Sequence, residues 1–138
     1  MAARSPSAQR APLVALALLA ALAQAAQAAT WECRVTAVWS PLLLPEADYL
    51  ARTQPTLRLE EPDDAQAGAV VTRCARDPAR QAVRCTRVEI DWVAVDAATA
   101  ARKYYNFAEH YDLQLFFDRS FVENDGRGGV VHGRCRPV

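Results

Sequence analysis

The sequence predicts an all-β fold, a small antiparallel barrel or sandwich of about seven to eight strands, disulfide-stapled and preceded by a cleaved signal peptide. Apolar and polar residues alternate over short runs that turn residues separate, and no long helical period interrupts them. The chain holds four cysteines, and an even number in a short exported chain is typical of a disulfide framework. The start of the chain has the charged, apolar and small-residue order of a secretory leader.

The leader is defined by its apolar run. Alanine and leucine dominate residues 11–25, and Ala26 and Ala28 then supply the small side chains that signal peptidase reads. The run is shorter than the roughly 20 residues that a membrane span needs, and no lipobox cysteine follows it. We predict a signal peptide over residues 1–28, with cleavage after residue 25 as the alternative, and a single β-rich domain over residues 29–138. The mature protein is expected to be periplasmic or secreted, with no membrane span.

The charge balance bears on the class of partner. Without the two arginines of the leader, fourteen basic residues face sixteen acidic ones, a formal charge of −2. Binding to nucleic acid requires a clustered basic excess, and the sequence shows none. We therefore expect no nucleic-acid partner.

The first half of the domain contains two predicted strands. Alternation is clearest over residues 31–39, and residues 56–60 place leucines at strand spacing. Between these strands, residues 41–45 form an apolar loop bounded by prolines, and residues 46–53 fit either a short helical turn or a strand. The acidic residues 60–68 predict a solvated loop, because the oxygen spacing of a calcium loop is missing.

The middle of the domain predicts a hairpin with residues 69–75 as its first arm and residues 82–95 as its second. In the second arm, apolar residues occupy odd positions up to Cys85 and even positions from Val88 onward, with Trp92 among them. Such a change of phase within one strand predicts a β-bulge near Thr86.

The last part of the chain predicts a strand over residues 102–107 and then a three-strand meander. Its strands are residues 111–117, 121–123 and 130–135, and the glycine-rich residues 124–129 form its final hairpin turn. The first and last strands of the domain both carry a cysteine on the core face. A closed or nearly closed barrel is favoured, since the chain ends then meet and the sheet edges pair.

Two disulfides follow from the same pattern. Cys74 and Cys85 are equidistant from the centre of the predicted hairpin, and opposed residues in antiparallel strands lie within disulfide range. This pairs Cys74 with Cys85 and leaves Cys33 to pair with Cys135. A zinc site is not favoured, because the chain has no CxxC pair. We expect no metal and no cofactor.

Catalytic candidates are limited to His110 and His132, which nearby carboxylates could orient. Strand phase places both histidines on polar faces, and no motif of a known nucleophile is present. The residues favour a non-enzymatic protein. The alternative is a small hydrolase or metal-dependent enzyme that uses the two histidines.

Binding candidates cluster in the glycine-rich turn. Arg127 sits at its tip, and successive amides in such a turn can bind an anion. Of the adjacent Tyr104 and Tyr105, which must point to opposite faces, we expect Tyr104 to be exposed. The candidate binding residues are Arg127, Asn124, Asp125, Tyr104, His110 and His132.

These residues predict an exported binding or inhibitor-like module for a protein or envelope component. The expected partner is another exported or envelope protein. A carrier of a small ligand inside an aromatic-lined barrel is a further alternative.

One family resemblance involves the two ends of the domain. Trp31-Glu32-Cys33 near the predicted mature N-terminus, together with Cys135 near the C-terminus, resembles small periplasmic lysozyme inhibitors, which have eight-stranded barrels. The serine- and glycine-containing inhibitory motif of that family is not recognisable in this chain, so no site residue is carried over.

Overall fold

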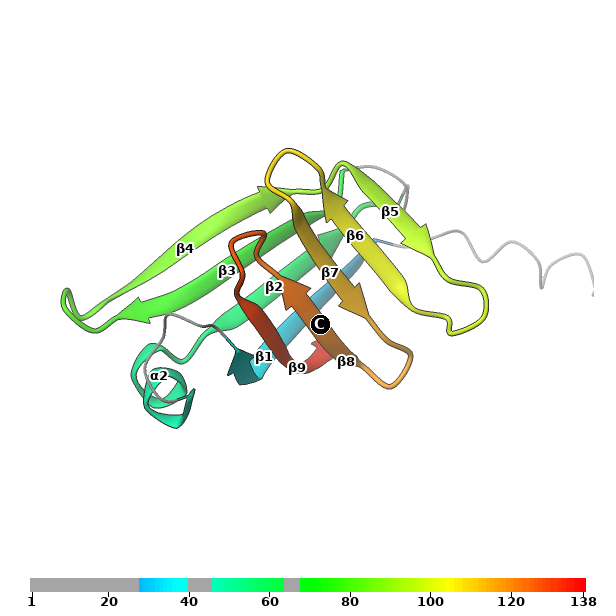
Figure 1. The fold of residues 1–138 in the computed structure, drawn as a ribbon. Coiled ribbons are helices and arrows are strands. Elements are labelled where there is room, and N and C mark those ends of the chain that lie inside the picture. Colours follow the sequence, from blue (N-terminus) through cyan, green and yellow to red (C-terminus); the bar gives the residue numbers. More distant parts are fainter. Residues whose placement is uncertain (1–27, 40–45, 64–67) are drawn as a thin grey trace, which may run out of the picture.

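A single antiparallel sheet of nine strands forms the domain in a computed structural model of the chain (Figure 1). The structure describes residues 28–39, 46–63 and 68–138. The predicted leader, the proline-bounded loop and part of the acidic loop lie outside these residues. The elements are β1 (Ala29–Trp39), α2 (Glu46–Thr53), β2 (Thr56–Glu61), β3 (Val70–Asp77), β4 (Ala82–Glu89), β5 (Trp92–Val95), β6 (Arg102–Asn106), β7 (Tyr111–Leu115), β8 (Ser120–Asn124) and β9 (Val130–Pro137). Among the described residues, no helix has the length and apolar character to cross a membrane.

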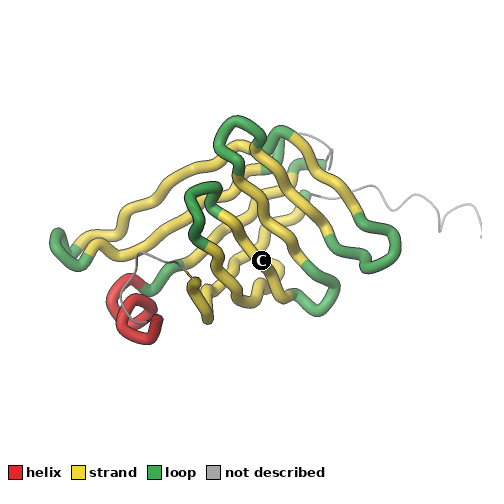
Figure 2. Tube along the Cα trace, in the orientation of Figure 1, coloured by secondary structure: helices red, strands yellow, loops and turns green. Residues whose placement is uncertain are grey.

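The sheet curls into a half-barrel, with strand order β4-β3-β2-β1-β9-β8-β7-β6-β5 (Figures 1 and 2). The first and last strands do pair, as expected, but they lie at the centre of the sheet rather than at its edges. The edges are β4 and β5, which are consecutive in the chain. They meet only at a bend, where the Ile90 amide donates to the Ala69 carbonyl (2.9 Å) and the Asp91 amide to the Tyr105 carbonyl (2.8 Å). The expected edge-to-edge closure is therefore replaced by this covalent bend.

The predicted strand over residues 82–95 is two strands, and the predicted bulge near Thr86 is wrong. β4 pairs with β3 without interruption, from Val70 opposite Glu89 to Asp77 opposite Ala82. The change of apolar phase has a different cause, because β4 is an edge strand that buries only Val88. A bulge does occur elsewhere, in β1 between Val35 and Ala37.

The concave face of the sheet holds the hydrophobic core. In β7 the expected alternation is confirmed, with Tyr111, Leu113 and Leu115 buried. Phe117, expected to continue the pattern, follows the end of the strand and is 81 % exposed. The predicted ambiguity over residues 46–53 resolves as α2, whose Leu50 packs against the core.

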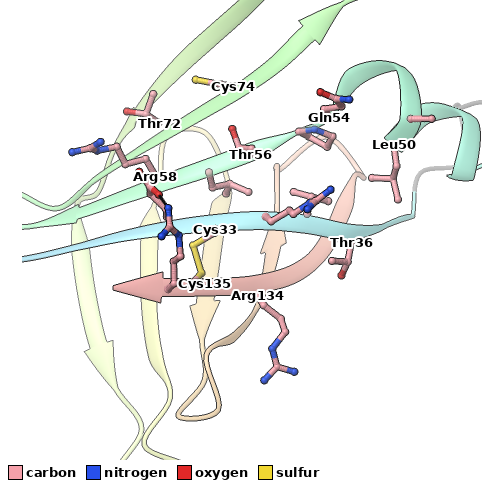
Figure 3. Close-up of a pocket in the computed structure, with 17 residues that line it drawn as sticks. Cys33, Thr36, Leu50, Gln54, Thr56, Arg58, Thr72, Cys74, Arg134 and Cys135 are labelled. Atoms are coloured by element: carbon pink, nitrogen blue, oxygen red, sulfur yellow. Dashed lines mark hydrogen bonds and ion pairs between the residues drawn. A yellow bond between two sulfur atoms is a disulfide. The ribbon is translucent and has the colours of Figure 1, made fainter. Parts of the chain in front are cut away.

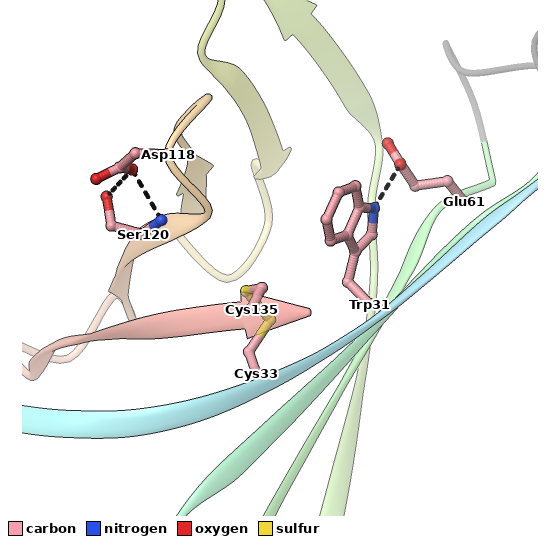
Figure 4. Close-up of a disulfide and its surroundings, with 6 residues drawn as sticks. All are labelled: Trp31, Cys33, Glu61, Asp118, Ser120 and Cys135. Atoms are coloured by element: carbon pink, nitrogen blue, oxygen red, sulfur yellow. Dashed lines mark hydrogen bonds between the residues drawn. A yellow bond between two sulfur atoms is a disulfide. The ribbon is translucent and has the colours of Figure 1, made fainter. Parts of the chain in front are cut away.

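Two disulfides staple the sheet at the pairs that the sequence predicts. Cys33 on β1 joins Cys135 on β9, directly opposite it (Figure 4), and Cys74 on β3 joins Cys85 on β4. Intramolecular disulfides persist in oxidising, extracytoplasmic compartments, which is where this chain is expected to reside.

Two carboxylates are buried between opposite walls of the half-barrel. Glu61, expected in a solvated loop, ends β2 and accepts hydrogen bonds from Tyr104 Oη (2.6 Å) and Trp31 Nε1 (3.1 Å; Figure 4). Arg102 Nη2 forms an ion pair with it at 2.6 Å. These bonds tie β1 and β2 to β6.

Glu123 bridges a second pair of walls. This carboxylate on β8 is 1 % exposed, and its Oε1 lies 2.8 Å from Arg73 Nε on β3. Burial raises the pKa of Glu123 above its ordinary value, while the neighbouring guanidinium opposes the rise.

Candidate functional site

Three chain connections meet at one end of the half-barrel and form the candidate site, here called the binding rim. They are the β4–β5 bend (residues 90–91), the β6–β7 turn (107–110) and the β8–β9 loop (125–129), visible at one end of the sheet in Figure 1. The rim also includes Trp92 and Tyr105, the strand residues next to the bend and the turn. The bend is tied to the turn because the Phe107 amide donates to Asp91 Oδ2 at 2.8 Å. The turn contacts the loop so closely that a Cβ at Gly126 would lie 2.1 Å from the Glu109 carbonyl oxygen. Only glycine permits this approach.

The β8–β9 loop is shaped by its own side chains. Asn124 Oδ1 accepts from the Gly126 amide (3.0 Å), and Asp125 Oδ1 accepts from the amides of Arg127 (2.8 Å) and Gly129 (3.0 Å). The amides of Gly126, Arg127 and Gly129, which could otherwise bind an anion, are therefore already bonded within the loop. Asn124 and Asp125 hold the loop in shape, and the exposed Arg127 lies at its tip.

The structure does not bring His110 and His132 together. His110 lies exposed in the β6–β7 turn with a φ of 53°, and His132 lies exposed on β9 opposite Val122. Two strand spacings and four residues of rise separate them, roughly 16 Å along the sheet. Within the described ranges, no three His, Cys, Asp or Glu side chains are grouped to hold a metal ion. The geometry gives no support to paired histidine catalysis.

The prediction that Tyr104 is exposed is wrong. Its side chain is fully buried, and its Oη donates to Glu61. Burial, reinforced by this hydrogen bond, raises the pKa of Tyr104 above its ordinary range. The neighbouring Tyr105 is the outward residue, because the inner position opposite Val93 is taken by Tyr104.

Tyr105 belongs to an aromatic cluster that sequence analysis missed. Its ring centroid lies 6.0 Å from that of Trp92 on β5 and 6.1 Å from that of Phe107 in the turn. The Tyr105 and Phe107 rings are nearly parallel, at 3°. Trp92 is 52 % and Phe107 59 % exposed, so the cluster presents apolar surface to solvent on the outer face. The adjacency of Tyr104 and Tyr105 was the one signal available, but it did not say which ring faced outward.

Polar residues lie on the strand and the connections next to the aromatic cluster. Asp112 lies opposite Tyr105 on β7, and the exposed His110 and Arg127 lie on the adjacent connections. Such an arrangement can contact a partner through exposed aromatic side chains that have polar and charged side chains beside them.

Three hollows of the described structure lie away from the rim. One of them, of about 480 Å³ beside Gln54, Ala75 and Gln81, has no aromatic side chain in its lining. A groove of about 1250 Å³ crosses the outer face of β1, β2 and β9 beside α2 (Figure 3). A smaller hollow of about 280 Å³ opens beside Arg73 and Glu123 on the concave face. Among the described residues, no aromatic side chain lines the groove, and Tyr49 alone lines the smaller hollow. This geometry does not match the expectation of an aromatic-lined carrier.

No known protein family, curated protein or solved structure matches the chain.

Proposed function

We propose that this protein is an exported, non-enzymatic binding module that recognises another exported protein or an envelope component through the binding rim. The observation that carries the proposal is the exposed cluster of Trp92, Tyr105 and Phe107. Exposed aromatic side chains gathered beside polar loops are typical of interaction sites, and tryptophan and tyrosine are enriched among the residues that contribute most to binding. The disulfides and the predicted leader support export.

The area of the aromatic cluster sets what the partner must cover. Three aromatic side chains present on the order of 200 Å² each, and about half of this remains exposed. Burying roughly 300 Å² at about 25 cal/mol per Å² gives a gross gain of about 7 kcal/mol. Association itself costs about 4 to 15 kcal/mol. The partner must therefore also contact the adjacent loops, where Arg127 and His110 are accessible.

The test compares rim variants with a matched aromatic control. The oxidised protein is used as bait in a periplasmic or secreted extract, alongside Trp92→Ala, Phe107→Ala and Phe117→Ala. Phe117 is even more exposed, at 81 %, but lies at the opposite end of β7, outside the aromatic cluster. We expect a captured partner to be retained by the Phe117 variant and to bind the two rim variants about 30-fold more weakly.

Thermal melting of each variant checks that the fold is intact, since substitutions of exposed residues usually change stability by less than about 0.5 kcal/mol. A partner that binds the Trp92 and Phe107 variants as tightly as the unaltered protein would exclude the rim as the contact surface.

A further inference from the structure

The groove on the outer face of the sheet is a second surface, separate from the binding rim. Arg134, in the groove, lies opposite Ser120 on β8, whereas Tyr105, in the rim, is level with Asn124 of the same strand. Three strand spacings and four residues of rise place the two surfaces roughly 20 Å apart along the sheet. Either surface can therefore lose its ligand without affecting the other.

The groove is strongly basic although the domain as a whole is not. The charged residues that line it are four arginines and one glutamate, a formal charge of +3: Arg34, Arg58, Arg134, Arg136 and Glu32. These arginines are dispersed along the sequence, and the pairing of β1 with β2 and β9 brings them onto one face of the sheet. This is the clustered basic surface that the sequence did not reveal.

Two of the arginines lie where their charges destabilise the sheet. Arg34 and Arg134 are directly opposite each other on β1 and β9, and like charges in that position destabilise a sheet. Arg134 Nη2 donates to the Asp118 carbonyl at 2.9 Å, and its charge is among the causes that lower the pKa of the Asp118 carboxyl. Among the described residues, neither Arg34 nor Arg134 forms an ion pair within 4.0 Å. By contrast, Arg58 and Arg136 form exposed ion pairs with Glu60 and Glu32, which exchange readily for other partners.

We propose that the groove binds an extended acidic segment of a partner polypeptide, with carboxylates at alternate positions. The basic residues form two rows across the strands. Arg34 and Arg134 make one row, and Arg58 and Arg136 flank Glu32 in the next, two residues along β1. Two residues of a strand rise by about 6.6 Å, which is also the spacing of alternate side chains in an extended peptide. Each guanidinium presents a planar fork that matches a carboxylate.

The walls of the groove favour a polypeptide over an anionic polysaccharide. On the α2 side the groove is lined by Leu50, Ala51 and Pro55, an apolar strip that suits the side chains between the carboxylates of a peptide. Hydroxyls of Thr36 and Thr56 line the same groove and can bond a peptide backbone.

The experiment measures binding of a defined peptide to the purified, oxidised protein. The probe is a fluorescein-labelled decapeptide in which five glutamates alternate with five serines, followed by fluorescence anisotropy at low salt. We expect binding that weakens as NaCl is added. Arg34→Gln and Arg134→Gln should each weaken binding about tenfold. The control Arg80→Gln removes the same charge from the β3–β4 turn, outside the groove, and should bind normally.

Stability separates a binding role from a structural one. Arg34→Gln relieves the repulsion between Arg34 and Arg134 and breaks no ion pair, so its melting temperature should equal or exceed that of the unaltered protein while binding falls. Arg134→Gln also loses the bond to the Asp118 carbonyl, so its melting temperature is not used in this comparison. A drop in melting temperature that accompanies the loss of binding would point to a structural role and overturn the proposal.

Comparison ligands test the nature of the occupant. A peptide with the same composition in two blocks should bind more weakly than the alternating one, and a glutamine-for-glutamate peptide should not bind. Absence of binding by the alternating peptide, or equal binding of the block peptide, would overturn the proposal. A heparin-derived oligosaccharide that binds more tightly with the same arginine dependence would instead assign the groove to an anionic sugar.

Discussion

Replacing Glu61 with alanine removes an acceptor that three donors share inside the half-barrel. Tyr104 Oη lies 2.6 Å from Glu61 Oε1, Arg102 Nη2 lies 2.6 Å from the same oxygen, and Trp31 Nε1 lies 3.1 Å from Oε2. The Tyr104 side chain is fully buried, so its hydroxyl has no route to water when Glu61 is removed. The Arg102 side chain is 32 % exposed and can turn part of its charge to solvent.

These differences set the expected loss. An unpaired buried hydroxyl costs about 1 to 3 kcal/mol, and breaking a buried ion pair from one side costs about 3 to 5 kcal/mol. Because Arg102 is partly hydrated, we expect Glu61→Ala to destabilise the domain by about 4 kcal/mol, a shift of more than about 10 °C in melting temperature. Tyr104→Phe loses one hydrogen bond to a charged acceptor, about 2 kcal/mol.

A double-mutant cycle tests whether the two losses share one interaction. Urea unfolding, followed by tryptophan fluorescence, gives the free energy of unfolding of the two single variants and of Glu61→Ala combined with Tyr104→Phe. We expect the double variant to lose about 1.5 kcal/mol less stability than the sum of the two single losses. The reason is that Tyr104→Phe removes the hydroxyl that Glu61→Ala leaves buried and unpaired. Additivity within about 0.5 kcal/mol would refute the proposed coupling.

Two further predictions concern the disulfides and Glu123. The bridge between β1 and β9 joins cysteines 102 positions apart, and the β3–β4 bridge joins cysteines 11 apart. Chain entropy assigns a stabilisation of roughly 4.7 kcal/mol to a loop of about 100 residues and less than about 3 kcal/mol to the short one. Replacing both cysteines of the long bridge with serine should therefore lower the melting temperature more than the same replacement in the short bridge, and the reverse order would contradict this account. Burial raises the pKa of Glu123 above 4.5, so the folded state holds this proton more tightly than the unfolded state; its contribution to stability is fully present below pH 4.5 and is lost as pH rises through the folded pKa. When melting temperatures are measured from pH 4.5 to neutrality, the melting temperature of Glu123→Gln should therefore rise relative to that of the unaltered protein as pH rises. Parallel curves for the two proteins would exclude a raised pKa of Glu123.

Local periodicity predicted the parts of the fold that local geometry controls. Alternation over residues 111–115 identified the buried face of β7, because a strand in a curved sheet has one face in the core. The pairing of Cys74 with Cys85 followed from the symmetry of a hairpin, which needs no knowledge of the remaining strands.

Prediction failed where the position of a strand in the sheet decides burial. Val83 is 68 % exposed because it lies on the outer face of β4, an edge strand, so its apolar character did not mark the core. The same phase grouped Trp92 with Val88, which is buried, whereas Trp92 follows the β4–β5 bend and faces outward in the aromatic cluster.

The buried carboxylates and the arginine groove depend on residues far apart in sequence. Glu61 and Tyr104 are separated by 43 positions, and Arg34 meets Arg134 only because β1 and β9 are neighbours. No short-range pattern distinguishes these residues from other charged residues on a solvated strand. The candidate loop was identified by its glycines, and the structure adds that Asn124 and Asp125 bond the loop internally.

The central position of β9 has a consequence for how the protein matures. During synthesis, β9, which lies between β1 and β8, is the last of the nine strands to be made. Both neighbouring strands therefore keep an unpaired edge until β9 has been made. Cys33 also remains without its disulfide partner Cys135, and Cys74 and Cys85 are made long before Cys135. An oxidant that acts early can join Cys33 to either hairpin cysteine, and only exchange through a mixed disulfide then recovers the native pairs. The rate of maturation is therefore expected to depend on the supply of a disulfide isomerase rather than on the speed of strand pairing.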